Sequence, residues 1–143
     1  MYVEAYELIH EILEDEELNK HVKETTGKRL AIVDSGPVAT VPAASITFVG
    51  GAVNRSENTL QHTDYTVTFS MPYWGADGMK KCHKLLDVAI EAFFAHELRE
   101  PSGRGQRRNY VLTVSPTLTE EDPEKKLWTV GLLVTVSIFR DEF

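Results

Sequence analysis

The chain has 143 residues, of which 42% are hydrophobic and 26% are charged, and its formal net charge is −7 at pH 7. This length and composition are typical of one ordinary globular domain, and they exclude a disordered chain, a collagen and a disulfide scaffold. The negative net charge argues against a protein whose main task is to grip nucleic acid, because that affinity comes largely from Lys and Arg side chains that neutralise phosphates.

Two helices are predicted at the N-terminus. Apolar residues recur at helical spacing over residues 2–14, which indicates an amphipathic helix. A second, short helix should follow, because Asp15 suits its first turn and Gly27 its C-terminal side. This segment has no basic region and no uninterrupted apolar core, so it is not a signal peptide. The apolar positions are Ala5, Leu8, Ile9 and Ile12, and the acidic ones are Glu4, Glu7, Glu11, Glu14, Asp15, Glu16 and Glu17.

Strands are expected next. Residues 30–34 form a short strand, and residues 35–42 form a turn-rich connection whose prolines exclude a central strand. Alternation from Ala44 to Val49 predicts another strand, and residues 50–61 are expected to be a long loop or a ragged hairpin arm. The acidic, Gly and Pro residues within 30–49 break this most apolar long stretch, so it cannot span a membrane.

Residues 62–94 combine a strand with a helix. Polar and apolar residues alternate up to Met71, as in a strand with one buried face. Pro72 and Gly75 then end the strand, and Asp77 can cap the incoming helix. The buried positions should be Tyr65, Val67, Phe69 and Met71 on the strand and Cys82, Leu85, Leu86, Ala89, Ile90 and Phe93 on the helix; Lys80, Lys84, Asp87 and Glu91 should face water.

The C-terminal third predicts a hairpin. Residues 101–108 are too rich in Gly, Pro and Arg to be regular, and alternation resumes over residues 110–115. Residues 116–126 should form an acidic loop, and residues 127–138 a last strand that pairs antiparallel with the previous one. The element order predicts a single α+β domain over residues 1–143, with a mostly antiparallel sheet of about four to five strands and helices packed on one face.

The sequence offers no clear catalytic or metal-binding set. Cys82 and His83 are adjacent, and side chains of neighbouring helical residues point about 100° apart, so they do not converge. Cys82 lies on the apolar stripe of its helix, which favours a buried hydrophobe, and a single cysteine is consistent with a reducing compartment. CxxC, HExxH and GxSxG motifs are absent. We therefore expect neither an enzyme nor a metal or cofactor.

The charge pattern suggests a subunit contact instead. Arginines in a Gly-rich loop usually face water, but they can also bind an acidic partner surface. The acidic first helix could supply that surface in a neighbouring copy, and a head-to-tail contact of this kind closes into a ring. The candidate interface residues are Arg104, Arg107, Arg108, Glu11, Glu14 and Trp74.

The whole pattern resembles the tail terminator, or tail completion, proteins of long-tailed bacteriophages. An acidic amphipathic helix is followed by the Pro-led strand VPAASITF at residues 41–48. A polar-alternating strand at residues 65–74 ends in an aromatic residue, and a short turn with Gly75 and Gly78 follows. Then come the helix LLDVAIEAF and a long alternating strand at residues 128–139. The resemblance covers most of the chain.

The resemblance implies a small subunit of a hexameric ring that caps the tail tube. Such a ring ends tube polymerisation and offers the surface to which the head joins. Its partners would be copies of itself, the tail tube protein and the head–tail connector protein, with DNA passing through without specific binding; no membrane is involved. The protein would reside in the virion tail, after assembly in the bacterial cytoplasm. An acidic chain is compatible with lining a DNA passage, because it repels DNA.

Two alternatives remain open. A head-completion, neck or other minor tail protein would have a similar outline. The rival from another class is a small cytoplasmic enzyme or ligand-binding α+β domain, with Cys82, His83 or the arginine loop at a pocket.

Overall fold

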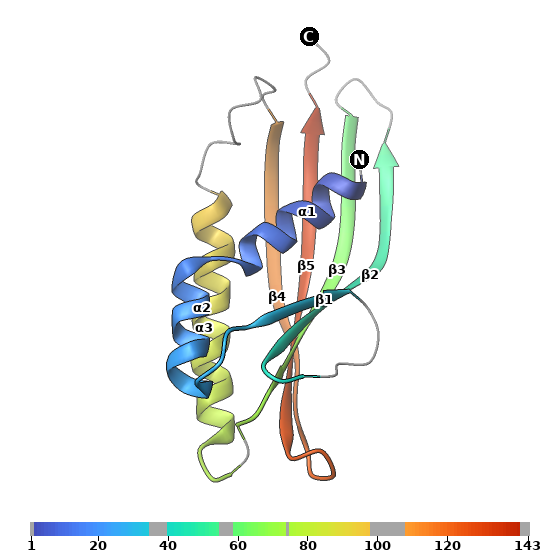
Figure 1. Ribbon diagram of the computed structural model, residues 1–143. Helices are drawn as coiled ribbons and strands as arrows, with labels where there is room; N and C mark the ends of the chain where they lie inside the picture. The colour runs from blue at the N-terminus through green and yellow to red at the C-terminus, as the bar shows by residue number, and fades with distance from the viewer. Residues whose placement is uncertain (1, 35–39, 55–58, 74, 98–107, 141–143) are drawn as a thin grey trace.

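The computed structural model describes residues 2–34, 40–54, 59–73, 75–97 and 108–140 (Figure 1). These residues form an α+β fold with a mostly antiparallel sheet, as the sequence predicts. Strand order across the sheet is β1-β2-β3-β5-β4; β1 runs parallel to β2, and the other neighbours are antiparallel. The elements in chain order are α1 (Tyr2–Leu13), α2 (Glu16–Thr26), β1 (Ala31–Asp34), β2 (Ala43–Asn54), β3 (Thr59–Met71), α3 (Gly78–Glu97), β4 (Arg108–Asp122) and β5 (Leu127–Arg140).

The helices form one layer over one face of the sheet. Figure 1 shows α1 crossing the strands obliquely, while α2 and α3 stand side by side at the β4 side. The hydroxyl of Tyr6 in α1 donates to Asp34 in β1, and its ring lies 6.3 Å from that of Tyr65 in β3. The first half of α1 therefore lies towards the β1–β2 side of the sheet, and its end meets α3.

Local signals fix the limits of α2, as the sequence predicts. The carboxylate of Asp15 accepts a hydrogen bond from the backbone N–H of Leu18 at 3.1 Å, which satisfies a donor of the first turn. Gly27 has φ of 78°, and its N–H donates to the carbonyl of Lys23 at 2.8 Å. This left-handed C-cap favours glycine, because a side chain would be strained there.

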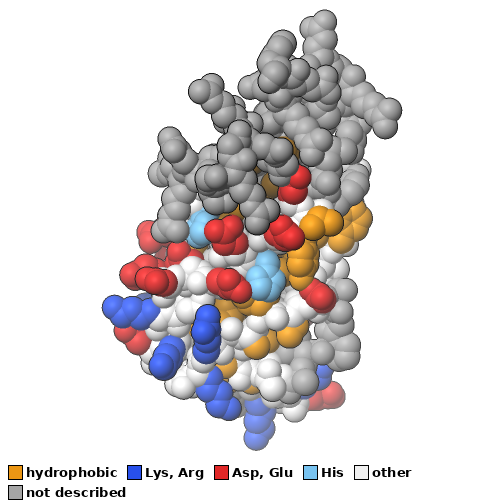
Figure 2. Space-filling model, turned by 45° about the horizontal axis from the view of Figure 1, so that its top comes forward, with side chains coloured by type: hydrophobic (Ala, Val, Ile, Leu, Met, Phe, Trp, Pro, Cys, Tyr) orange, Lys and Arg blue, Asp and Glu red, His pale blue; other side chains and the backbone are white. Residues whose placement is uncertain are grey.

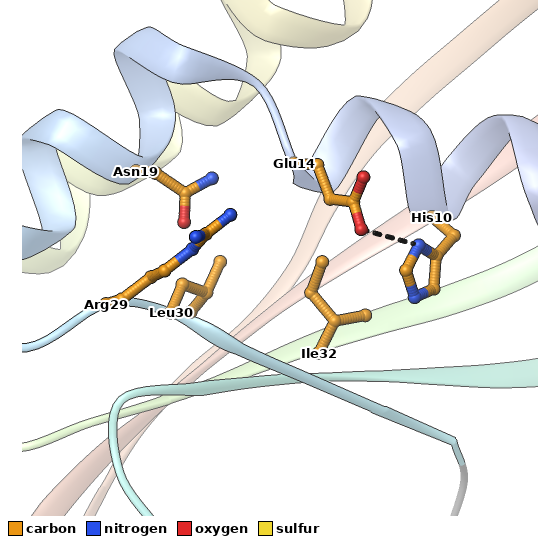
Figure 3. Close-up of a pocket in the computed structure, with 6 residues that line it drawn as sticks. All are labelled: His10, Glu14, Asn19, Arg29, Leu30 and Ile32. Carbon is orange, nitrogen blue, oxygen red and sulfur yellow. Dashed lines mark ion pairs between the residues drawn. The ribbon is translucent and has the colours of Figure 1, made fainter.

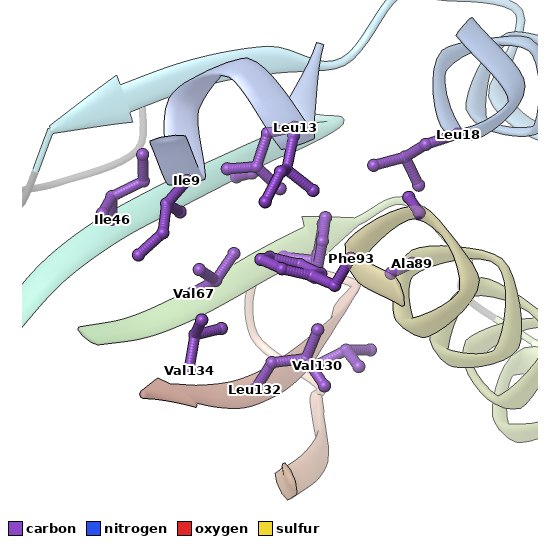
Figure 4. Packing of buried hydrophobic residues seen from close by; sticks show 14 of the residues in the cluster. Ile9, Leu13, Leu18, Ile46, Val67, Ala89, Phe93, Val130, Leu132 and Val134 are labelled. Atoms are coloured by element: carbon purple, nitrogen blue, oxygen red, sulfur yellow. The ribbon is translucent and has the colours of Figure 1, made fainter. Parts of the chain in front are cut away.

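The core lies between the helix layer and alternate residues of the strands (Figure 4). Phe93 of α3 is fully buried, and Val67 and Val134 on the central strands are buried on the same face of the sheet. Ile9 of α1 is fully buried and belongs to the same core. The predicted alternation of β3 and the apolar stripe of α3 are thus confirmed, because these side chains are the ones the two layers exclude from water.

Residues 50–61 were expected to be a long loop or a ragged hairpin arm, and the second alternative is confirmed: β2 continues to Asn54 through a register shift between Phe48 and Gly50, and β3 begins at Thr59. The acidic loop predicted at residues 116–126 is wrong. β4 continues to Asp122 through a second shift between Pro116 and Thr119, so the acidic loop shrinks to the turn at residues 123–126. In the sequence, Gly50, Gly51 and Pro116 suggest strand ends. An edge strand tolerates a proline, however, and a bulge tolerates either glycine or proline.

Candidate functional site

The thiol of Cys82 is shielded from solvent in this fold. Cys82 is fully buried on the core side of α3, and burial raises its pKa to about 11, so the thiol stays protonated at neutral pH. His83, next in sequence, is exposed to solvent. Among the described residues no group of three or more His, Cys, Asp or Glu side chains could hold a metal ion. Within the same ranges no helix has the length and apolar character to cross a membrane.

A small polar pocket lies where α1 meets α2 above β1 (Figure 3). The Nδ1 atom of His10 lies 3.3 Å from a carboxylate oxygen of Glu14, and Arg29 approaches from the strand side. The amide of Asn19 donates to the carbonyl oxygens of Leu13 and Asp15, at 3.0 and 2.9 Å, so it holds the corner between the helices. The volume of about 220 Å³ is below that of a usual small-molecule site. The pocket is therefore a weak candidate for ligand binding.

A buried polar pair ties this corner to the other end of the helix layer. The Nε2 atom of His96 in α3 lies 3.8 Å from the Asp15 carboxylate, and both side chains are about nine-tenths buried. The hydroxyl of Tyr110 in β4 donates to the backbone carbonyl of His96 at 2.6 Å. Because Asp15 also caps α2, these contacts link α2 and α3 to β4 at one edge of the sheet.

No helix of the described residues lies on the second face of the sheet, and polar side chains cover it. Asp64 accepts a hydrogen bond from the hydroxyl of Thr135 at 2.6 Å, and His62 lies 2.7 Å from that of Ser137. The described residues that alternate with the core positions of the four long strands are mostly Ser and Thr. This open face is polar, with little charge at its centre.

Exposed large hydrophobic side chains gather at the two sides of the molecule. Phe48 and Val49 of β2 are 55% and 59% exposed, and Val3 of the first turn of α1 is 65% exposed. At the opposite side, Val111 of β4 and Phe94 of the adjacent α3 are 44% and 47% exposed. Single exposed hydrophobics are ordinary, but residues that gather at opposite edges suit contacts with other chains.

Charge is segregated on the helix side. In Figure 2 acidic side chains gather in the middle of the view and Lys and Arg side chains below them. The exposed acidic residues from α1 to the first turn of α2 are Glu7, Glu11, Glu14, Glu16 and Glu17; the exposed charged residues that follow are basic at Lys20, Lys23, Lys28 and Arg29 and acidic at Glu24. None of these basic residues is among the interface residues predicted from the sequence.

The predicted interface residues fall partly outside the described chain. Glu11 is exposed on α1, and Glu14 follows the end of that helix, where it pairs with His10. Arg108 begins β4, the outermost strand. Arg104, Arg107 and Trp74 lie outside the described residues, as does the Arg108 side chain. The contact between these arginines and the acidic helix of a neighbour stays a prediction.

Val49 and Val111, which are exposed at the edges of the sheet, were not predicted as interface residues. Val111 lies on the open face together with Thr113 and Ser115, so an apolar residue on the solvent-exposed side of a strand was the available signal. Val49 lies at the register shift of β2, which alternation alone does not predict.

The fold has a counterpart among solved structures. No family model matches the sequence, and no curated protein matches it in sequence. A chain of the solved structure "Virion of native gene transfer agent (GTA) particle" superposes with a TM-score of 0.50. The match covers 92% of this chain and 91% of that chain, at 11% sequence identity. The two chains therefore share a fold over nearly their whole lengths.

Proposed function

We propose that this protein is a structural subunit of a phage-like virion that assembles into a ring, expected to be hexameric, at the end of the tail tube. The observation that carries the proposal is the whole-length fold likeness to a chain of a gene transfer agent virion. The resemblance of the sequence pattern to tail terminator proteins makes the finer role that of a cap, which ends tube growth and offers the surface for head joining.

The surfaces support a role in assembly over a role in catalysis. The one cysteine is buried, and the described pocket is small. Exposed hydrophobic side chains instead lie at the two sides of the subunit, where ring neighbours would meet. The partners proposed are further copies of the chain, the tail tube protein and the head–tail connector.

The charge suits a channel for DNA. The net charge of −7 repels phosphates, and the open face of the sheet offers Ser and Thr hydroxyls with little charge. DNA would then pass without sticking. A neck or head-completion role makes the same demands on these surfaces.

Light scattering over a concentration series, with negative-stain images of any large species, tests the ring. An open-centred ring of about six subunits supports the proposal. Binding of the purified protein to the ends of tail tubes, with arrest of their growth, then separates a tail cap from a neck protein. A strict monomer that leaves tube growth unchanged would contradict both roles.

The arginines can be tested in the same assay. Arg104, Arg107 and Arg108 changed together to Glu should leave the monomer folded and reduce ring formation. The matched control changes Lys80, Lys81 and Lys84, three exposed basic residues near the start of α3, to Glu. Both variants alter the net charge equally. If both weaken the ring to the same extent, the effect is one of total charge and the arginines are not a specific contact.

A further inference from the structure

The sheet has two open edges at the same end. β1 pairs only with residues 43–46 of β2, so residues 47–54 of β2 have no described strand on their outer side. β4 is the outermost strand at the opposite side, and a bulge at Pro116 divides it. We call residues 47–54 of β2 and 108–115 of β4 the upper edge segments, because both lie at the upper end of the sheet in Figure 1.

Among the described residues, most of the features that protect an edge against pairing lie in the lower parts of these two edges. Monomeric proteins cover an edge strand or place charges, Pro or bulges on it, because its unpaired N–H and C=O groups otherwise recruit another strand. Here β1 covers the lower part of β2, and the lower part of β4 carries Pro116, Glu120, Glu121 and Asp122. The upper segment of β2 reads TFVGGAVN, and that of β4 after Arg108 reads NYVLTVS. Neither segment contains a proline, the one charged residue of the two is Arg108 at the end of the β4 segment, and the β2 segment includes the register shift between Phe48 and Gly50.

The two upper segments match in height and direction. Ala52 and Val111 lie in one row across the sheet, because Ala52 is opposite His62, His62 opposite Ser137 and Ser137 opposite Val111. Thr47 and Ser115 share another row by the same path, through Thr66 and Leu133. Since each neighbouring pair from β2 to β4 is antiparallel, β4 runs antiparallel to β2. Two copies placed side by side in the same orientation would therefore continue the alternating pattern.

Exposed hydrophobic side chains flank both segments. Val49 and Phe48 project from the β2 segment, and Val111 projects from the β4 segment. Phe94 is exposed on α3, the helix beside β4. Contact between the two edges would bury apolar surface as well as pair backbone groups, which edge-to-edge association needs.

We propose that residues 108–115 of one copy pair antiparallel with residues 47–54 of the next, so that one sheet runs from subunit to subunit. The contact joins two different edges, and it therefore propagates head to tail and closes into a ring when the rotation permits. In this arrangement the helices of every copy lie on the same face of the shared sheet. This inference rests on the proposed ring and names the surface that builds it.

Cysteine cross-linking tests the pairing. Ala52→Cys is combined in one chain with Val111→Cys, and Thr47→Cys with Ser115→Cys, because each pair shares a row; all four positions are exposed on the open face. Wild-type protein is the blank, because its only cysteine is buried. Oxidation of at least one double variant should give a covalent ladder that ends at the ring size, while each single variant stays uncross-linked. A single variant that forms dimers indicates a twofold contact and overturns the head-to-tail pairing.

An edge charge provides the second test. Val111→Lys should raise the concentration at half-assembly about tenfold or more, as an added edge lysine opposes pairing. Leu118→Lys is the matched control, since Leu118 is an exposed hydrophobic residue of the same strand beyond the bulge. Wild-type mass is measured alongside. If the wild type forms a ring but no double variant cross-links, the pairing is overturned and the ring stands. Equal effects of the two lysines would lead to the same conclusion. A monomeric wild type overturns the ring and the pairing together.

Discussion

Gly78→Ala should destabilise the protein, although alanine favours helices. Gly78 begins α3 and is buried against the far end of the β4–β5 hairpin. A Cβ atom at this position would lie 2.1 Å from Nε1 and 2.6 Å from Cε2 of Trp128, and 2.6 Å from the carbonyl oxygen of Tyr73. These distances are too short for any contact, so the indole, the backbone or the start of α3 must move.

The expected net cost is about 2 kcal/mol. Overpacking of a core site costs roughly 1–3 kcal/mol, and a rigid indole together with a backbone oxygen places this site at the upper end. Replacing Gly by Ala inside a helix returns up to about 1 kcal/mol, and less at its first residue. For a domain of this size the loss corresponds to a fall of about 6–8 °C in Tm.

Urea unfolding followed by circular dichroism, at a concentration below assembly, measures the change. Gly50→Ala is the control, because a Cβ there meets nothing within 4 Å, and its effect should stay within about 0.5 kcal/mol. In a Trp128→Leu background, Gly78→Ala should lose the part of its cost that comes from the indole, while the close approach to the Tyr73 carbonyl oxygen remains. A neutral or stabilising Gly78→Ala would refute the steric explanation, and an equal cost in both backgrounds would refute the role of the indole.

Three further changes test the core, the thiol and one helix–strand contact. Phe93→Ala should cost about 3–5 kcal/mol in urea unfolding, because the ring is fully buried; a cost under about 1 kcal/mol would contradict that packing. Cys82 should react with iodoacetamide at pH 8 about 100-fold more slowly in the folded than in the unfolded chain, and equal rates would show an open site. The hydrogen bond to Asp34 raises the pKa of Tyr6 from 10.0 to about 12, so the folded state favours the protonated phenol. That stabilisation is present below pH 10 and lost as pH rises towards 12. Wild type should therefore lose more stability than Tyr6→Phe over this window, and parallel losses would rule out the contact.

Much of the fold was predictable from local patterns. Residues 65–71 have the period of a strand, and α3 has the period of a helix. Each period arises because one face of the element is buried, and it can therefore be seen in a short stretch of sequence. The caps at Asp15 and Gly27 are equally local, since each involves backbone groups within four residues. The α+β class followed from the order of these elements.

Less of the candidate site could be predicted from the sequence. The sequence drew attention to charged residues in a Gly-rich loop, and their contact remains a prediction. The exposed Val111 had a weak signal, but its meaning depends on β4 being the outermost strand. Which strand is outermost cannot be read from alternation.

The sequence by itself determined the two periodicities, the helix caps and the burial of Cys82, because neighbouring residues set them. Only the tertiary structure decided how far β2 and β4 extend, since their hydrogen bonds come from β3 and β5, which are distant in the chain. It also decided that β1 covers just the lower part of β2. The two open edges, and with them the proposed contact between copies, arise from strand order, which is a property of the whole sheet.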